Sequence, residues 1–258
     1  MADHSLVLPE RQTKPRIRGL TMVIDNGIPA SLLEDVLDSY HEYVDMVKFG
    51  WGTALVTRSI KRKIGALTER RVPFLFGGTL FEKYVHQGRF DEYRALCHNF
   101  GCRYVEVSNG TIALEPTMKA ELISALTGEF DVLAEVGFKD QPRSELLSPS
   151  QWIANISSDL QAGAKYVVLE SRESGSSGIC RPDGELRYGL IEDILLSGVD
   201  INRLLFEAPT KGMQTYFVKR VGPEANLGNI AAMDVLALET LRLGLRADTL
   251  LDYPMEAT

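Results

Sequence analysis

The sequence predicts an α/β protein built as a single (β/α)8 TIM barrel, and three observations support this prediction. Eight short runs rich in Val, Ile, Leu and Phe recur with starts about 29 residues apart on average, the length of one strand, one helix and two loops. Segments with helical periodicity separate these runs. No linker-like segment divides the chain, so the alternation favours one continuous domain.

Each apolar run is expected to be a strand buried on both faces, because parallel strands covered by helices are nearly continuous in hydrophobic residues. A doubly wound open sheet is the alternative, but no GxGxxG motif follows the first run. In chain order the expected strands cover residues 20–25, 45–49, 72–77, 103–108, 131–136, 165–170, 203–207 and 225–227.

Helix start and stop signals lie between the runs. A serine or threonine followed three residues later by Glu or Gln has the spacing of a capping box. Gly163 is a common type of helix stop. The charged run 58–63 is expected to be a solvated helix face. The capping pairs are Ser31 with Glu34, Thr79 with Glu82, and Ser148 with Gln151.

We expect the barrel to occupy residues 19–250, with an N-terminal arm at 1–18 and a C-terminal tail at 251–258. Whether residues 1–18 form an arm or a lid over the bottom of the barrel stays open. The formal charge of -7 argues against a nucleic-acid partner, and no apolar stretch approaches a membrane span. The three cysteines, at positions 97, 102 and 180, predict reduced thiols, and a cytoplasmic location is expected.

Charged residues gather at the expected strand ends, where barrels of this kind carry their chemistry. A charge in an apolar strand is costly to bury unless it is paired or coordinated, so this set predicts a site rather than ion pairs that only close the barrel. The acids are Asp25, Glu106, Glu135, Glu170 and Glu207, and the bases are Lys48, Lys139, Arg172 and Lys211.

The residue types bound the chemistry of this site. The histidines at positions 4, 41, 86 and 98 lie away from the strand ends, which excludes histidine-based triads and metal sites. Carboxylates without His or Cys suit Mg²⁺ or Mn²⁺, and lysines with an arginine suit a phosphorylated anion. Backbone amides at two glycine-containing turns would bind such an anion. These turns contain Gly77 and Gly78, and Asn226, Gly228 and Asn229 after the eighth run.

From the residues alone we expect a Mg²⁺-dependent enzyme acting on a small phosphorylated carboxylate. A lysine would serve either as an acid or base or as a Schiff-base former. The spacing does not separate these roles.

Eight motifs in order resemble the phosphosulfolactate synthase family, from about Leu8 to Thr249. These motifs are VDMVKFGWGTA (44–54), FGGTLFEKY (76–84), GCRYVEVSNGT (101–111), LAEVGFKD (133–140), ESRESGSSGIC (170–180), LLFEAPTK (204–211), ANLGNI (225–230) and LETLRLGLRADT (238–249).

This resemblance implies a lyase that adds sulfite to phosphoenolpyruvate with Mg²⁺, giving (2R)-phospho-3-sulfolactate for coenzyme M biosynthesis or sulfolactate formation. It also implies a homo-oligomer. Lys139 matches the family's proposed proton donor, and Lys48, Arg172 and Lys211 match positions that we assign to anion binding. We expect Glu106, Glu135 and Glu170, with Glu207, to hold the metal, and Asp25, Gly78, Asn226, Gly228 and Asn229 to bind substrate.

Two alternatives stay open. An enzyme on the same scaffold would add a different nucleophile to phosphoenolpyruvate. A heat-stress-associated relative would lack synthase activity, but the presence of Lys139 and the strand-end acids argues against that reading.

Overall fold

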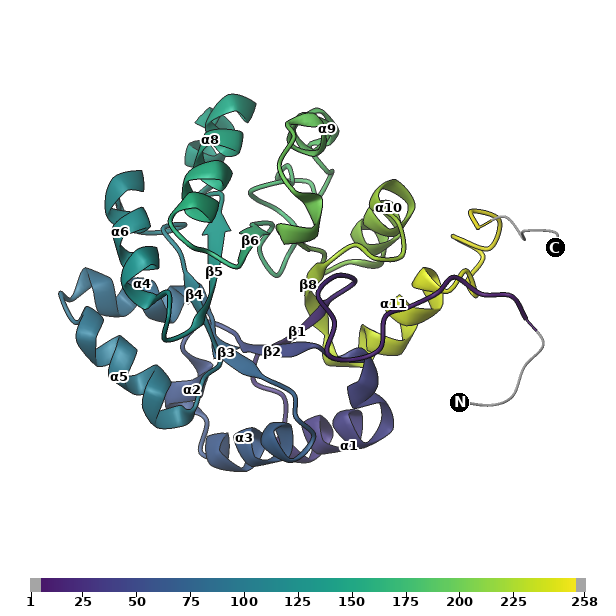
Figure 1. The fold of residues 1–258 in the computed structure, drawn as a ribbon, viewed down its shortest axis with the longest axis horizontal. Helices are drawn as coiled ribbons and strands as arrows, with labels where there is room; N and C mark the ends of the chain where they lie inside the picture. Colours follow the sequence, from purple (N-terminus) through teal and green to yellow (C-terminus); the bar gives the residue numbers. More distant parts are fainter. Residues whose placement is uncertain (1–5, 254–258) are drawn as a thin grey trace.

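A computed structural model describes residues 6–253 and contains eight parallel strands that surround a central axis, with helices outside them (Figure 1). The (β/α)8 barrel predicted from the sequence is therefore confirmed, and the open doubly wound alternative is wrong because β1 pairs with β8. The strands are β1 (Thr21–Asp25), β2 (Met46–Phe49), β3 (Phe74–Phe76), β4 (Tyr104–Val107), β5 (Asp131–Val136), β6 (Tyr166–Leu169), β7 (Leu204–Glu207) and β8 (Leu227–Ala231).

The barrel is nearly closed. The hydrogen-bonded order is β3-β2-β1-β8-β7-β6-β5-β4, with registers such as Val23 opposite Val47 and Leu169 opposite Phe206. Strands β3 and β4 lie side by side, but among the described residues no ladder of backbone hydrogen bonds joins them. This junction is called the β3–β4 seam below.

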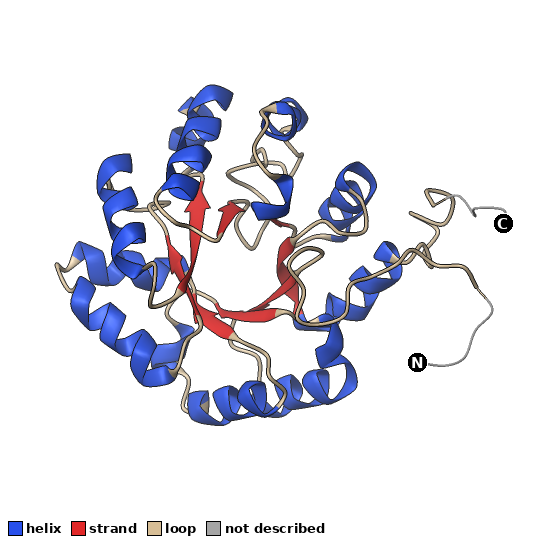
Figure 2. Ribbon diagram, viewed as in Figure 1, coloured by secondary structure: helices blue, strands red, loops and turns tan. Residues whose placement is uncertain are grey.

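Helices form the outer layer around the strands (Figure 2). In the described part of the chain, none is long and apolar enough to span a membrane. The α-helices are α1 (Ala30–Tyr40), α2 (Thr53–Val56), α3 (Ile60–Glu69), α4 (Gly78–His86), α5 (Phe90–Phe100), α6 (Pro116–Leu126), α7 (Gln141–Leu146), α8 (Pro149–Gln161), α9 (Tyr188–Leu196), α10 (Lys211–Val221) and α11 (Val235–Arg242), with 3-10 turns η1 (His41–Tyr43), η2 (Ile201–Arg203) and η3 (Ala232–Asp234).

The helix start signals had mixed outcomes. Ser148 caps α8 with a complete capping box to Gln151, and Gly163 follows the end of that helix, as predicted. The other two capping boxes are wrong. Helix α1 already begins at Ala30, one residue before Ser31, and α4 begins at Gly78 with no side-chain cap.

The interior of the barrel has an apolar layer below a charged one. Residues two apart on a strand point to the same side of the sheet. An apolar residue that points into the barrel is therefore followed, two positions later, by another interior residue that lies closer to the carboxyl end of the strand. Four strands place a charge in this second layer. The pairs are Met46 and Lys48, Tyr104 and Glu106, Leu133 and Glu135, and Leu205 and Glu207.

The eighth strand departs from its predicted position. It covers Leu227–Ala231 instead of residues 225–227, because glycine and asparagine within it hide its apolar pattern. Asn226 therefore lies at the amino end of β8, where its amide accepts from the Leu20 N–H and donates to the Leu204 carbonyl, both at 3.0 Å. No turn with Gly228 and Asn229 follows β8, because both residues are inside it.

The described part of the predicted arm, residues 6–18, contains no helix or strand and runs across the amino ends of the strands. Arg11 bridges Glu224 and Glu239 at 2.8 and 3.0 Å, and Arg16 contacts Asp45 at 3.0 Å. The remainder of the arm, including position 4, and tail residues 254–258 lie outside the described residues.

Candidate active site

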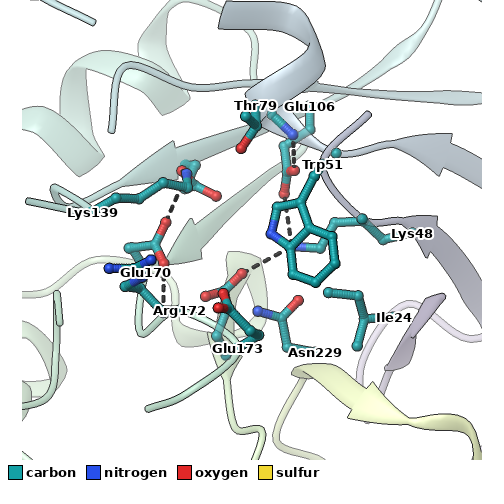
Figure 3. Close-up of a pocket in the computed structure, with 15 residues that line it drawn as sticks. Ile24, Lys48, Trp51, Thr79, Glu106, Lys139, Glu170, Arg172, Glu173 and Asn229 are labelled. Carbon is teal, nitrogen blue, oxygen red and sulfur yellow. Dashed lines mark hydrogen bonds and ion pairs between the residues drawn. The ribbon is translucent and has the colours of Figure 1, made fainter. Parts of the chain in front are cut away.

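A polar pocket opens at the carboxyl ends of the strands (Figure 3). The arm contacts the other end of the barrel. The charged residues of the pocket come from β2, β4, β5, β6 and β7 or from the loops directly after these strands, which agrees with the predicted location of the site. The polar and aromatic side chains that line it belong to Lys48, Trp51, Thr79, Glu106, Glu135, Lys139, Glu170, Arg172, Glu173, Glu207 and Asn229.

Lys48 on β2 bridges two acids across the barrel. Its Nζ lies 2.9 Å from Glu207 Oε1 and 3.4 Å from Glu106 Oε1, and all three side chains are almost fully buried. Burial alone would lower the pKa of Lys48, but the carboxylates of Glu106 and Glu207 outweigh it and raise that pKa. Lys48 is therefore a fixed positive charge in the pocket.

Lys139 lies among three acids on the opposite side of the pocket. Its Nζ contacts Glu135 Oε1 and lies 2.9 Å from Glu170 Oε2 and 3.9 Å from Glu82 Oε1. Burial lowers the pKa of Lys139, but these carboxylates raise it well above its usual value. Lys139 thus holds a proton, and with 22% of its side chain exposed it can reach a bound substrate.

The pKa values of the two carboxyls beside Lys139 are shifted in opposite directions. Burial raises the pKa of Glu135, yet the ammonium groups of Lys139 and Lys48 lower it to about 2. Burial and the neighbouring Glu135 carboxylate raise the pKa of Glu170 well above its usual value. Two carboxyls that share a buried site cannot both ionise easily, so Glu135 is ionised and Glu170 resists ionisation.

The side chain of Glu106, on β4, contacts the amino end of α4. The Gly78 N–H donates to Glu106 Oε2 at 2.5 Å, so the backbone amide expected to bind a substrate anion binds the protein's own carboxylate. A Cβ at position 78 would lie 2.6 Å from Ser108 Cβ, so glycine permits α4 to approach β4 this closely. This contact crosses the β3–β4 seam.

Backbone strain is concentrated at the pocket. Four non-glycine residues of the described chain have positive φ, and three of them line the pocket: Trp51, Arg172 and Asn229. Such conformations are costly for these residues and cluster at functional sites. The buried Oδ1 of Asn229 has no hydrogen-bond partner, and within the described residues the Arg172 side chain forms no ion pair. Both groups are available to a ligand.

Four residues predicted for this site lie elsewhere. Asp25 pairs with buried Lys63 at 2.6 Å, which also corrects the expectation of a fully solvated face at 58–63. Lys211 is half exposed and pairs with Asp248 at 2.8 Å. Asn226 is at the opposite end of β8, and Gly228 packs against Leu205 and Met22 inside the barrel.

Three buried residues next to the pocket were missed. Glu82 and Ser108 contact the Lys139 cluster, and the Lys119 ammonium donates to the Glu135 carbonyl and to Asp159 Oδ2, both at 2.6 Å. The spacing from Thr79 to Glu82 predicts a capping box, and this pattern gives no sign that Glu82 contacts the Lys139 cluster. Lys119 gave no sequence signal, because a lone lysine on a helix is usually solvated.

The donor set fits a hard cation held with the help of substrate. Among residues 6–253, no three Asp, Glu, His or Cys side chains meet as a preformed metal site, because the lysines separate the acids. However, five buried carboxylates surround two lysines, and Glu170 Oε2 forms an ion pair with the Lys139 ammonium at 2.9 Å. Mg²⁺ commonly uses only one or two carboxylates, together with water and substrate phosphate. Glu135 and Glu170, which both contact Lys139 Nζ, fit this requirement.

The sequence resembles one family along nearly its whole length. A family model described as (2R)-phospho-3-sulfolactate synthase (ComA) matches residues 9–248. The chain is 48% identical over 249 residues to a phosphosulfolactate synthase from Bacillus subtilis, covering 96% of this chain and 99% of the relative. It is 40% identical over 254 residues to a phosphosulfolactate synthase from Methanothermobacter thermautotrophicus, covering 97% and 98% of the two chains.

More distant similarities extend to other proteins. Protein HEAT-STRESS-ASSOCIATED 32 from Arabidopsis thaliana is 22% identical over 260 residues, covering 90% of this chain and 88% of the relative. Among solved structures, the YdjI aldolase of Escherichia coli K12 aligns with a TM-score of 0.54 at 13% identity, covering 82% and 75% of the two chains. A 3-hexulose-6-phosphate synthase also aligns with a TM-score of 0.54, at 14% identity, covering 85% and 98%. These structural matches show the fold alone.

Proposed function

Because this chain belongs to the (2R)-phospho-3-sulfolactate synthase family and is an enzyme of the lyase class, we propose that it adds sulfite to phosphoenolpyruvate with the help of Mg²⁺. The observation that carries the proposal is the position of Lys139, a protonated lysine held between Glu135 and Glu170 at a pocket with further cations. An addition to an enol phosphate needs these two features, a proton donor and fixed positive charge.

Phosphoenolpyruvate carries a carboxylate and a phosphate, so its binding requires cations that are free to contact it. Arg172 has no ion-pair partner in the described chain and offers a guanidinium that matches either group. Lys48 provides a second positive charge deeper in the pocket. The Asn229 amide, held by its strained backbone, adds a neutral polar contact.

In the reaction, the sulfur lone pair of sulfite forms a bond to the methylene carbon of phosphoenolpyruvate. The electrons of the carbon–carbon double bond move onto the carboxylate and give an enolate. Lys139 then donates a proton from Nζ to the phosphate-bearing carbon, and the neutral amine regains a proton from solvent. Lys48 stabilises the negative charge that develops on the carboxylate.

Glu135 and Glu170 would hold Mg²⁺, which when bound would stabilise negative charge on substrate oxygens. Glu106 and Glu207 have a different role, because each is committed to Lys48 and Glu106 also accepts from Gly78. This assignment reduces the four metal ligands expected from the sequence to two. The cytoplasmic location and the homo-oligomer stay predictions.

The test is a phosphorus NMR assay of purified protein with phosphoenolpyruvate, sulfite and Mg²⁺. We expect the enol phosphate signal to be replaced by that of a saturated phosphate ester, only when sulfite and Mg²⁺ are both present. EDTA should stop the reaction, and added Mg²⁺ should restore it. Absence of product while phosphoenolpyruvate still binds would contradict sulfite as the nucleophile and favour another nucleophile on the same site. Absence of both would favour a role without synthase activity.

A further inference from the structure

We propose that Glu82 is a positioning residue that holds Lys139 in place through the loop of residues 108–112, which follows β4. The proposal rests on the proposed function for its catalytic consequence, but its structural basis is independent of the reaction. Glu82 is on α4, is 2% exposed, and does not itself line the pocket.

Glu82 fastens both ends of this loop. Its Oε1 accepts a hydrogen bond from Ser108 Oγ at 2.5 Å, and its Oε2 accepts from the backbone N–H groups of Thr111 and Ile112 at 2.9 and 3.1 Å. Hydrogen bonds to a buried charged group are stronger than those between neutral groups. The Glu82 carboxylate thus accepts the hydrogen bonds of two backbone N–H groups that lie beyond the end of β4, where no neighbouring strand of the described chain pairs with them.

The fastened loop in turn determines where Lys139 lies. The backbone N–H of Lys139 donates to the Gly110 carbonyl at 3.0 Å. Ser108 Oγ lies 2.6 Å from Glu135 Oε1 and 3.4 Å from Lys139 Nζ, so the same loop also orients the carboxylate partner of Lys139. Glu82 Oε1 itself remains 3.9 Å from Lys139 Nζ, too far for a hydrogen bond.

Gly110 shows how little room the lysine has. A Cβ at this position would lie 3.0 Å from Lys139 Nζ and 3.2 Å from Glu135 Oε1. Because these separations are tighter than ordinary contacts, a methyl group here would move the ammonium by a few tenths of an ångström. The loop therefore limits the space available to the Lys139 ammonium, and the hydrogen bonds of Glu82 hold the loop in this position.

The first test compares Glu82→Ala, Glu82→Gln and a control, Glu239→Ala. Glu239 is also a buried glutamate, but it pairs with Arg11 far from the pocket. A misplacement of about 1 Å can cost about 100-fold in rate, so we expect Glu82→Ala to lower kcat by about 100-fold with little change in KM for phosphoenolpyruvate. Glu82→Gln keeps an oxygen for the loop N–H groups and should recover part of kcat. Glu239→Ala should leave kcat unchanged.

The second measurement does not need turnover. Amine-selective labelling of Lys139, followed by mass spectrometry, reports the accessibility of its Nζ in each variant. We expect a several-fold change in the labelling rate in Glu82→Ala and none in Glu239→Ala. If wild type forms no phosphosulfolactate but labelling of Lys139 still depends on Glu82, the proposed reaction fails and the positioning role stands. Unchanged labelling and unchanged kcat in folded Glu82→Ala would overturn the positioning role.

Gly110→Ala keeps the proposal testable if Glu82→Ala does not fold. This substitution leaves Glu82 intact and displaces the Lys139 ammonium from the other side. It is expected to lower kcat and to alter Lys139 labelling, with secondary structure by circular dichroism unchanged. Wild-type kcat and labelling in this variant would overturn the proposal.

Discussion

Lys63 Nζ and Asp25 Oδ2 lie 2.6 Å apart in a nearly solvent-free environment, with side-chain exposures of 1% and 0%. Asp25 also accepts from the backbone N–H groups of Gly27 and Ile28 at 2.8 and 3.0 Å. This pair connects α3 to the carboxyl end of β1. Both residues therefore have a structural role in the barrel and are not free to bind substrate.

Removing one partner of this pair should destabilise the fold strongly. Lys63→Met leaves the Asp25 carboxylate buried without its counter-ion, and we expect a loss of about 3–5 kcal/mol in the free energy of unfolding. Lys61→Met, on the exposed side of the same helix, is the matched control and should change stability by less than about 0.5 kcal/mol. Urea unfolding monitored by circular dichroism measures both, and equal values would contradict a buried structural pair.

Lys139 and Lys211 should respond differently to the same substitution. Proton donation by a positioned side chain contributes about 100- to 10,000-fold, so Lys139→Met is expected to lower kcat by that range. Lys211→Met should retain near wild-type kcat, since Lys211 pairs with Asp248 outside the pocket. Steady-state assays with phosphoenolpyruvate and sulfite provide the comparison. A large loss of activity in Lys211→Met would show that the pocket extends to α10.

Arg172 offers a guanidinium to the substrate, but its backbone has a left-handed conformation, with φ +63°, that is unfavourable for a residue with a Cβ. Arg172→Ala and Arg172→Gly both remove the guanidinium, and both should raise KM for phosphoenolpyruvate. Only glycine relieves the left-handed strain, which costs about 1–2 kcal/mol for other residues. We therefore expect the glycine variant to be about 1 kcal/mol more stable than the alanine variant, measured by denaturant unfolding. The opposite order of stability would argue against strain at this position.

The pH dependence of stability should change in opposite ways when Glu135 and Glu170 are replaced. The pKa of Glu135 is lowered to about 2, so its contribution is present above its unfolded value of 4.5 and is lost as pH falls towards 2. The pKa of Glu170 is raised, so its contribution is present below 4.5 and is lost as pH rises through the raised pKa.

Glu135→Gln should therefore be less stable than wild type above pH 4.5, with a difference that shrinks at lower pH. Glu170→Gln should gain stability relative to wild type as pH increases. Unfolding free energies measured from about pH 3 to pH 8 provide the check, with Glu239→Gln as a buried control away from the pocket. Parallel curves for the two pocket variants would contradict the opposite shifts.

The barrel and the charged strand ends were predictable because both follow from local patterns. Apolar runs at regular spacing identify strands, and a lysine or glutamate within such a run, such as Lys48 or Glu135, signals a paired charge. The eighth strand was misplaced because Gly228 and Asn229 interrupt its apolar pattern. Here Asn229 is inside a strand, where asparagine is uncommon.

Other parts of the site were not predictable because they depend on contacts between distant elements. Glu82 and Lys119 face the strands from helices, and only the three-dimensional arrangement brings them to Ser108 and the Glu135 carbonyl. Asp25 and Lys211 occupy the expected ends of their strands, but each has a closer partner that the sequence order conceals.

The β3–β4 seam has a consequence for how relatives of this chain can diverge. Strand pairing does not join its two sides in the described structure, but Glu106 and Glu82 bond across it to Gly78 and Ser108. Selection for an intact barrel would therefore preserve these two acids even in a descendant that no longer performs the reaction. Retention of Glu82 and Glu106 is thus weak evidence of activity in a distant homologue. The more informative positions are Lys139 and Arg172, whose side chains form no hydrogen bond across the seam in the described structure.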